Sequence, residues 1–280
     1  MRAARNVVLM VFEDSDSLIS VKNDKLETLV KWFSRVEAWS ERVCTSSRAP
    51  RRYWERSYAG WRRFTAEQPG AAHVALASLE QAGRINFMIT HNVDRLYSKL
   101  HHSAGSNPLE LHGTVYSVIC LDCGFSFFRN LFQDEVKVLN PKWAAAIESS
   151  DFGSPGSDKS FGLKQRPDGD IEILKPDLRY FHYMKPDVVF FGDNMPKERA
   201  DKAMEVAREC DAFLALGSSL MTMYAFRLVR AAHEAGASTA IVNVGKTRAD
   251  YFVSMKINAR MGEIFPRVLN TGSLSIPALR

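Results

Sequence analysis

The C-terminal third of the chain alternates apolar runs with amphipathic segments. Three apolar runs, each followed directly by glycine, are typical of buried strands: Val188–Phe191, Ala212–Leu216 and Ser238–Val244. Two segments between them have apolar residues at helical spacing: Lys197–Cys210 and Tyr224–Ala235. This alternation predicts an α/β fold, with a parallel sheet covered by helices.

The first half continues the same pattern less regularly. Ala71–Ala82 reads as a helix that Gly83 ends, and Ile85–Ile89 reads as a strand that leads into Thr90. An aromatic stripe at helical spacing lies upstream and indicates core or a lid: Tyr53, Trp54, Tyr58, Trp61 and Phe64. Residues 151–170 are rich in glycine, proline, serine and charge, so we expect a flexible excursion there.

Composition excludes several classes of protein. The chain has 280 residues, 46% of them hydrophobic, and no apolar run long enough for a transmembrane helix. Its net charge of +5 allows an acidic partner, but without a lysine-rich block a mildly basic surface is favoured, so neither membrane nor direct nucleic-acid binding is expected. Four cysteines with one close pair favour a reducing compartment, and no targeting segment is legible.

Polar residues and glycines follow the predicted strands at their carboxyl ends, which is where parallel sheets bind ligands. The positions are Thr90-His91-Asn92-Val93-Asp94, Gly192-Asp193, Gly217-Ser218-Ser219 and Asn243-Val244-Gly245. Any one of them is explained by ordinary turn chemistry. Four such ends on one edge of a sheet favour a nucleotide site.

Two further positions could carry chemistry. His112, between leucine and glycine, is either a general base or a packed core histidine. Cys120 and Cys123 have the spacing of a zinc knuckle, but structural zinc needs four ligands and no second C-x-x-C follows. A dehydrogenase or a zinc-ribbon nucleic-acid binder is disfavoured, because both a G-x-G-x-x-G fingerprint and a full zinc pair are missing.

An ordered set of motifs from about residue 51 to 266 resembles the sirtuin family of NAD-dependent protein-lysine deacylases. The motifs are T-H-N-V-D, A-G-S, L-E-L-H-G-T-V, C-L-D-C-G, K-P-D-V-V-F-F-G-D-N-M-P, L-A-L-G-S-S-L, I-V-N-V-G-K-T-R-A-D and M-G-E-I. They are most similar to the branch that contains mitochondrial sirtuin 4 and its plant relatives. The resemblance implies a Rossmann-like sheet with a small zinc-ribbon-type insertion, and acylated lysines in proteins or peptides as substrates. It implies a mitochondrial matrix location, with nucleus or cytoplasm as the alternative.

The resemblance also implies roles for individual residues. His112 would be the general base that takes a proton from a ribose hydroxyl as the acyl group passes to ADP-ribose. Cys120 and Cys123 would be two of four zinc ligands, and Val188–Gly192 would pair with the substrate backbone. The residues implied in NAD binding are His91, Asn92, Val93 and Asp94 around nicotinamide, Gly217, Ser218, Ser219, Asn243, Val244 and Gly245 around adenosine, and Met261 beside the adenine.

The chain departs from the family pattern at four places. Residues 1–50 contain no glycine, so the family's G-A-G-x-S phosphate loop is absent there, although Val7–Phe12 could supply the strand before it. His91 stands where the family has glutamine, the path from Asp94 to Ala104 is about three residues longer, and the second zinc pair is missing. These departures suggest an N-terminally truncated sirtuin, with a catalytically inactive sirtuin-fold protein that binds an NAD-like ligand, peptide or partner as the alternative.

The resemblance divides the chain into segments. Residues 51–115 and 186–265 would form the NAD-binding catalytic domain, and residues 116–185 the small zinc-type module that includes the flexible excursion. Residues 1–50 would be an atypical N-terminal segment and residues 266–280 a C-terminal tail.

Overall fold

The protein is described here from a computed structural model, which covers residues 6–12, 48–100, 107–149, 184–190, 192–271 and 276. The chain forms two compact units. Unit 1 contains the first strand, Gln68–Thr114 and the described residues from Asn194 onward; unit 2 contains the described residues from Arg48 to Glu67 and from Val115 to Asp193.

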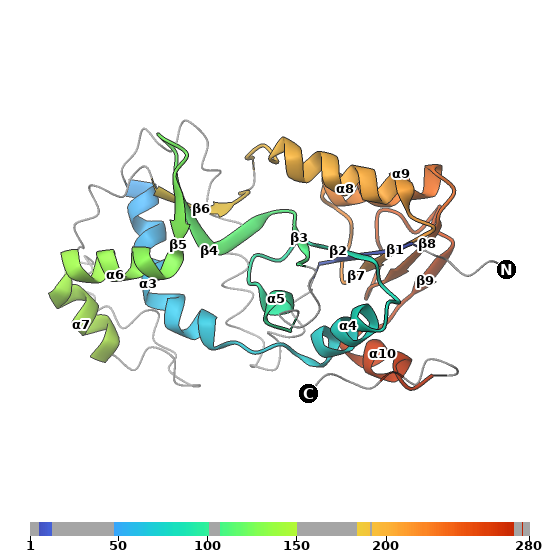
Figure 1. Cartoon of the computed structure of the whole chain (residues 1–280), viewed down its shortest axis with the longest axis horizontal. Coiled ribbons are helices and arrows are strands. Elements are labelled where there is room, and N and C mark those ends of the chain that lie inside the picture. The colour runs from blue at the N-terminus through green and yellow to red at the C-terminus, as the bar shows by residue number, and fades with distance from the viewer. Residues whose placement is uncertain are drawn as a thin grey trace. The chain divides into compact units, whose positions relative to one another are not determined.

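Unit 1 is built on a six-stranded sheet in the order β3-β2-β1-β7-β8-β9, in which every neighbouring pair is parallel (Figure 1). Its strands are β1 Val7–Val11, β2 Phe87–Thr90, β3 Leu109–Glu110, β7 Ala212–Leu216, β8 Ser238–Val242 and β9 Met255–Ile257. Its helices are α4 Ala71–Gln81, α5 Leu96–Leu100, α8 Lys197–Glu209, α9 Met223–Glu234 and α10 Met261–Val268. The parallel α/β architecture predicted from the sequence is confirmed.

The central strand β1 is apolar throughout because both of its faces are covered. Val8 and Met10 pack in a cluster with residues of α8 and α9, whereas Leu9 and Val11 pack in a second cluster with residues of α4 and α10. All four side chains are fully buried. Alternation of side chains along the strand thus divides four consecutive apolar residues between two cores, as parallel strands with helices on both faces require. Figure 1 shows these helix pairs on opposite faces of the sheet.

The strands of unit 1 end at a common edge. Val11 of β1 lies opposite both Thr90 of β2 and Leu216 of β7, and Leu216 lies opposite Val242 of β8. After β1 the chain next supplies strands on one side of it, β2 and β3, and later the strands on the other side, beginning with β7. The β1/β7 boundary is therefore the topological switch point, beside which open α/β sheets bind ligands.

Unit 2 contains a three-stranded sheet in the order β5-β4-β6, with β4 and β5 antiparallel. Its strands are β4 Gly113–Cys120, whose first two residues belong to unit 1, β5 Ser126–Phe128 and β6 Met184–Val188. Its helices are α3 Arg48–Ala66, α6 Arg129–Leu139 and α7 Pro141–Ser149.

The core of unit 2 is aromatic and encloses a cation. The guanidinium carbon of Arg129 lies 4.7 Å from the ring centre of Trp54 and 4.8 Å from that of Trp61, and Gln133 accepts hydrogen bonds from its Nε and Nη2. Burial lowers the pKa of Arg129 to about 10. The aromatic stripe lies on α3, and its residues Tyr53, Trp54 and Tyr58 pack in the core, as expected.

One predicted strand is wrong. The sequence placed a strand of the large sheet at Val188–Phe191, but the strand is β6, Met184–Val188, and it belongs to the three-stranded sheet. Phe190 instead packs its ring 5.7 Å from that of Tyr53 in the core of unit 2. Val188 and Phe190 of the apolar run thus pack in this core. Pro186, which cannot donate a backbone hydrogen bond, is tolerated because β6 lies at the edge of its sheet.

The other predicted elements are found with small shifts. The helix at Ala71–Ala82 is α4, the strand at Ile85–Ile89 is β2, and the strand at Val7–Phe12 is β1. The helices predicted before and after β7 are α8 and α9, and β8 ends two residues before the predicted end. The expected excursion at 151–170 lies outside the described residues.

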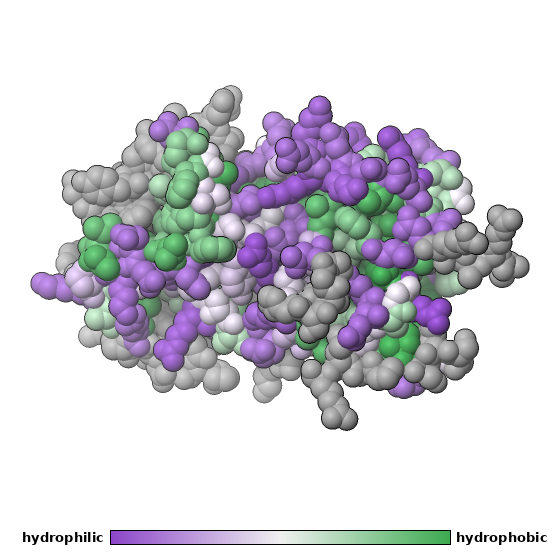
Figure 2. All heavy atoms as spheres, viewed as in Figure 1, coloured by the Kyte–Doolittle hydropathy of each residue, from purple (hydrophilic) through white to green (hydrophobic). Residues whose placement is uncertain are grey.

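The surface adds two observations. Figure 2 shows apolar side chains over β5 and α6 of unit 2, where the exposed hydrophobic residues are Phe125, Phe128, Leu131, Val138 and Leu139. Among the described helices, none combines the length and apolar character needed to cross a bilayer.

Candidate active site

Two histidines meet beside the end of β2. His91 directly follows β2, and its backbone N–H donates to Val11 of β1 at 3.0 Å. Strand β3 lies parallel to β2, and Leu111, the residue after it, donates its backbone N–H to Thr90 at 2.9 Å, which brings His112 alongside. The His91 Nδ1 and His112 Nε2 atoms are 3.0 Å apart, so one ring donates a hydrogen bond to the other.

Burial keeps both rings neutral. Desolvation, with a smaller contribution from the charge of His112, lowers the pKa of His91 to about 3. Desolvation, with a smaller contribution from Arg199 on α8, lowers the pKa of His112 to about 4. The outer nitrogens, Nε2 of His91 and Nδ1 of His112, are buried and have no hydrogen-bond partner among the described residues. The pair is therefore a neutral dyad with two unused polar ends.

The rest of the T-H-N-V-D turn is held by local hydrogen bonds. The Thr90 hydroxyl oxygen accepts from the Asn92 backbone N–H at 3.0 Å, and Asp94 Oδ1 accepts from the Leu96 N–H at 3.0 Å at the start of α5. The Thr114 hydroxyl donates to the Val93 carbonyl at 3.4 Å. Asp94 therefore also orders this turn, as the alternative of turn and cap chemistry anticipates.

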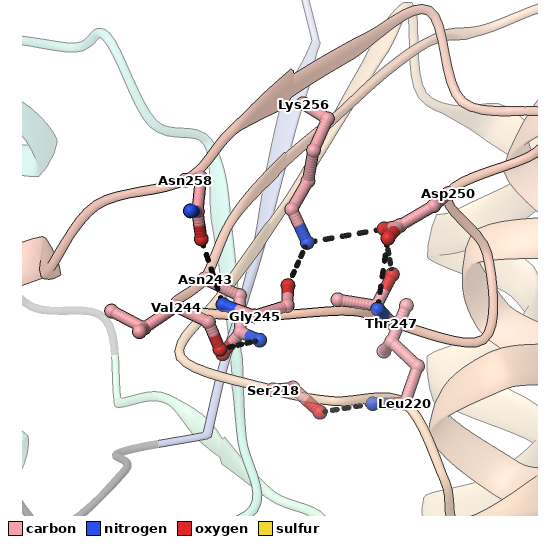
Figure 3. A network of polar contacts seen from close by, with 9 residues as sticks. All are labelled: Ser218, Leu220, Asn243, Val244, Gly245, Thr247, Asp250, Lys256 and Asn258. Carbon is pink, nitrogen blue, oxygen red and sulfur yellow. Dashed lines mark hydrogen bonds and ion pairs between the residues drawn. The ribbon is translucent and has the colours of Figure 1, made fainter.

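The ends of β7 and β8 form a second polar cluster (Figure 3). Gly217, with φ 59°, donates its N–H to Val242 at 2.9 Å, and the Ser218 hydroxyl oxygen accepts from the Leu220 N–H at 3.1 Å. The Asn258 side chain accepts from the Gly245 N–H at 2.7 Å. These bonds fix the two loops that follow β7 and β8.

Asn243 presents an unused acceptor at this edge. Its side chain is 3% exposed, and its amide nitrogen donates to the Val244 carbonyl at 2.9 Å. Its Oδ1 is buried without a hydrogen-bond partner among the described residues. A buried carbonyl oxygen without a partner costs free energy unless a ligand or water supplies a donor.

Comparisons with known proteins agree with the family resemblance found in the sequence. A family model described as "Sir2 family" matches residues 32–223. The chain belongs to the Sir2 family. It is 71% identical over 247 residues to the "NAD-dependent protein deacylase SRT2" of Arabidopsis thaliana. The aligned region covers 84% of this chain and 64% of the relative. It is 37% identical over 227 residues to the human "NAD-dependent protein lipoamidase sirtuin-4, mitochondrial". That aligned region covers 78% of this chain and 66% of the relative.

Solved structures support the same fold. One described as "The Structural basis for Sirtuin Substrate affinity" matches with a TM-score of 0.66 and 25% identity, over 97% of this chain and 94% of the other. The predicted place beside plant and sirtuin-4-like members is thereby confirmed. This sirtuin spans slightly less than two thirds of the length of the two curated relatives named above.

The predicted site residues fall into three groups in this sirtuin. His91–Asp94, Gly217–Ser219 and Asn243–Gly245 follow β2, β7 and β8 at one edge of the parallel sheet, with His112 bonded to the first group. Met261 is buried at the start of α10 and packs in the core cluster of α4 and α10. Cys120 and Cys123 belong to unit 2.

Several contributors to the site were missed in the sequence. Arg199 affects His112 from within α8, and Phe12 packs its ring 5.5 Å from that of His91. Lys256 on β9 donates to the Gly245 carbonyl at 2.9 Å and pairs with Asp250 at 3.1 Å. Only Asp250 lay in a recognised motif, and no local pattern marks the others, because they reach the site through tertiary packing.

The neutral dyad makes stability depend on pH. The folded-state pKa of each histidine is lowered from about 6.5, so the unfolded chain binds more protons below that pH. The contribution of the two rings to the unfolding free energy is therefore at its full value above about pH 6.5. It falls as pH falls towards 4, by about 1.4 kcal/mol per pH unit for each ring. We expect His91→Gln to reduce this slope between pH 6.5 and 5 in urea unfolding.

The control for this measurement is His233→Gln, which removes an exposed histidine of α9. It should leave the dependence of unfolding free energy on pH as in the wild type. Equal slopes for wild type and His91→Gln would show that His91 is not held neutral by the fold.

Proposed function

We propose that this sirtuin is an NAD-dependent protein-lysine deacylase, which transfers the acyl group of a lysine to ADP-ribose and releases nicotinamide. One observation carries the proposal: His112 lies at the ligand-binding edge of the sheet, neutral and hydrogen-bonded through Nε2 to His91 at 3.0 Å. A neutral imidazole with an unused nitrogen is able to accept a proton. The names of the relatives, deacylase and lipoamidase, support the same class of reaction.

The residues at the edge fit NAD. Asn243 offers a buried carbonyl oxygen to a hydroxyl or amino group, and the Ser218 hydroxyl, already an acceptor within its loop, keeps its proton for donation. The backbone of Gly217 is buried with a positive φ, where a side chain would be strained and would obstruct a ligand. Amide, hydroxyl and bare backbone are the groups with which proteins bind ribose and nucleobase edges.

Each group has a proposed role. His91, Asn92, Val93 and Asp94 would line the nicotinamide pocket, Gly217, Ser218, Ser219, Asn243, Val244 and Gly245 would hold the adenosine half, and Met261 would lie beside the adenine. Bound NAD would supply an activated ribose carbon that loses nicotinamide. His112 would accept a proton from a hydroxyl of the bound ligand, and the low polarity of its surroundings would strengthen hydrogen bonds formed there. The family has its phosphate loop before the segment that corresponds to Thr90, but residues 1–50 of this chain contain no glycine, and residues 13–47 lie outside the described ranges.

The substrate would be an acylated lysine in a protein or peptide. Val188–Gly192, which begin at the last residue of β6, would pair with the substrate backbone as an added strand. The side chain of Asp193 accepts from the Phe190 N–H at 3.2 Å and pairs with Lys185, which orders the segment from one end. We propose a location in the mitochondrial matrix, and the word mitochondrial in the name of the human relative supports that organelle.

Activity tests the proposal directly. Incubated with NAD and an acyl-lysine peptide, the protein should release nicotinamide and yield deacylated peptide. His112→Ala should slow deacylation by about 10²- to 10⁴-fold, because a positioned general base contributes that much. Mass spectrometry of the peptide, with His233→Ala as control, measures the change. A wild type that gives neither product favours the catalytically inactive, ligand-binding alternative.

Zinc is proposed only as a weakly held ion. The backbone N–H groups of Cys123 and then Asp122 hold the pKa of the Cys120 thiol below its usual value, as suits a metal ligand. Cys210 is a poor further ligand, because its thiol donates to the Ala207 carbonyl at 3.3 Å and burial raises its pKa to about 11. The described residues contain no group of three or more metal-ligating side chains, and structural zinc takes four.

Metal analysis checks the zinc assignment. After dialysis against a chelator, the protein should retain much less than one zinc ion per chain, with its thermal midpoint nearly unchanged. A Cys120→Ser, Cys123→Ser double variant should behave in the same way. One tightly held zinc per chain, lost in the double variant, would contradict a half site and place two further ligands outside the described residues.

A further inference from the structure

The hydrogen bond between His91 and His112 links the tautomers of the two rings. Both rings are neutral, so the 3.0 Å contact between His91 Nδ1 and His112 Nε2 contains one proton. If His112 donates from Nε2, then His91 must also carry its proton on Nε2. If His91 donates from Nδ1, then His112 must also carry its proton on Nδ1. The two rings therefore always share the same tautomer.

We propose that His91 and His112 form a two-ring proton relay, in which a proton that enters at one outer nitrogen is matched by a proton that leaves at the other. This inference rests on the proposed deacylase function, because it needs His112 to act as the base. His91 acts through His112, so it is a positioning residue for the reaction.

The transfer balances atom by atom. The pair begins with both protons on Nε2, which leaves the lone pair of His112 Nδ1 open. A hydroxyl of the bound ligand gives its proton to that Nδ1, the His112 Nε2 proton passes to His91 Nδ1, and the His91 Nε2 proton passes to a water molecule. Each ring gains one proton and loses one, so both end neutral in the other tautomer. The reverse transfer restores the starting state.

Burial favours such a relay over a single base. A protonated His112 would be a cation in a desolvated site with Arg199 nearby, and both effects lower the pKa of His112. Concerted transfer through two rings does not require the charge to be stored on either. The unused ends fit this role, since Nε2 of His91 and Nδ1 of His112 are both buried without a partner among the described residues.

Glutamine, which the family has at the position of His91, could not take part in such a relay. An amide can donate to or accept from His112, but it does not exchange one proton for another between two nitrogens under ordinary conditions. His91 stands at the end of β2 with its ring 5.5 Å from that of Phe12, whose side chain is 36% exposed at the end of β1. The relay would therefore run from His112 towards the carboxyl end of β1, where water could accept the proton.

Nitrogen NMR of the ligand-free protein tests the pair without any reaction. Spectra of ¹⁵N-histidine-labelled protein at pH 7 should show both rings neutral and in the same tautomer, with scalar coupling across the bond between His91 Nδ1 and His112 Nε2. His91→Asn is the matched variant, because its amide occupies the place of Nδ1 but offers no outer nitrogen. Opposite tautomers, or no coupling in the wild type, would overturn the relay.

Product analysis then tests its use. In His91→Asn, the amount of deacylated peptide formed for each nicotinamide released should fall about tenfold or more, because the relay acts after nicotinamide has left. In mixtures of H₂O and D₂O, the deacylation rate should curve with deuterium content in the wild type and vary linearly in His91→Asn and His91→Gln. If the variants keep both the wild-type rate and the curvature, the relay is wrong and the proposed function still stands. A wild type without nicotinamide release overturns the proposed function and the relay's role with it.

Discussion

The parallel pairing of β1 with β2 on one side and β7 on the other is the constraint on which unit 1 depends. It places Val11, Thr90 and Leu216 at one level, so the loops that follow them emerge at one edge. Because side chains alternate along β1, the strand also joins the two apolar clusters that hold the helices in place. Each Å² of apolar surface buried in these two clusters contributes roughly 25 cal/mol to the stability of the fold. Packing of the clusters thus supports the same geometry that assembles the site.

At that edge, low polarity decides the chemistry. Desolvation keeps His91 and His112 neutral, and it leaves three buried atoms, one on each histidine and Asn243 Oδ1, without partners among the described residues. Unmade hydrogen bonds of this kind cost stability in the ligand-free protein. Natural proteins keep such costs where a ligand repays them, so the orphaned atoms are the physical reason to regard this edge as a binding site.

How far the sequence predicts the structure depends on whether the signal is local. Periodicity located α4, α8, α9 and β7 well, because each contrasts a buried face or run with flanking polar residues and glycine. It misplaced β6, since Phe190 of the apolar run packs against Tyr53, which is more than a hundred residues away. The motifs identified His91 and His112 separately. Their contact, like those of Arg199 and Lys256, comes from tertiary packing that no local pattern encodes.

The central claim is that the carboxyl edge of this sheet binds NAD. The most direct test is the thermal unfolding midpoint as NAD is raised into the millimolar range, for the wild type and for an Asn243→Leu variant that removes the buried acceptor. A ligand that binds only the folded state raises stability by RT ln(1 + [L]/Kd), about 2.7 kcal/mol at one hundred times Kd. We expect a concentration-dependent rise in the wild type and a much smaller one in the variant. No rise in the wild type, or equal rises in both, would contradict the assignment of this edge.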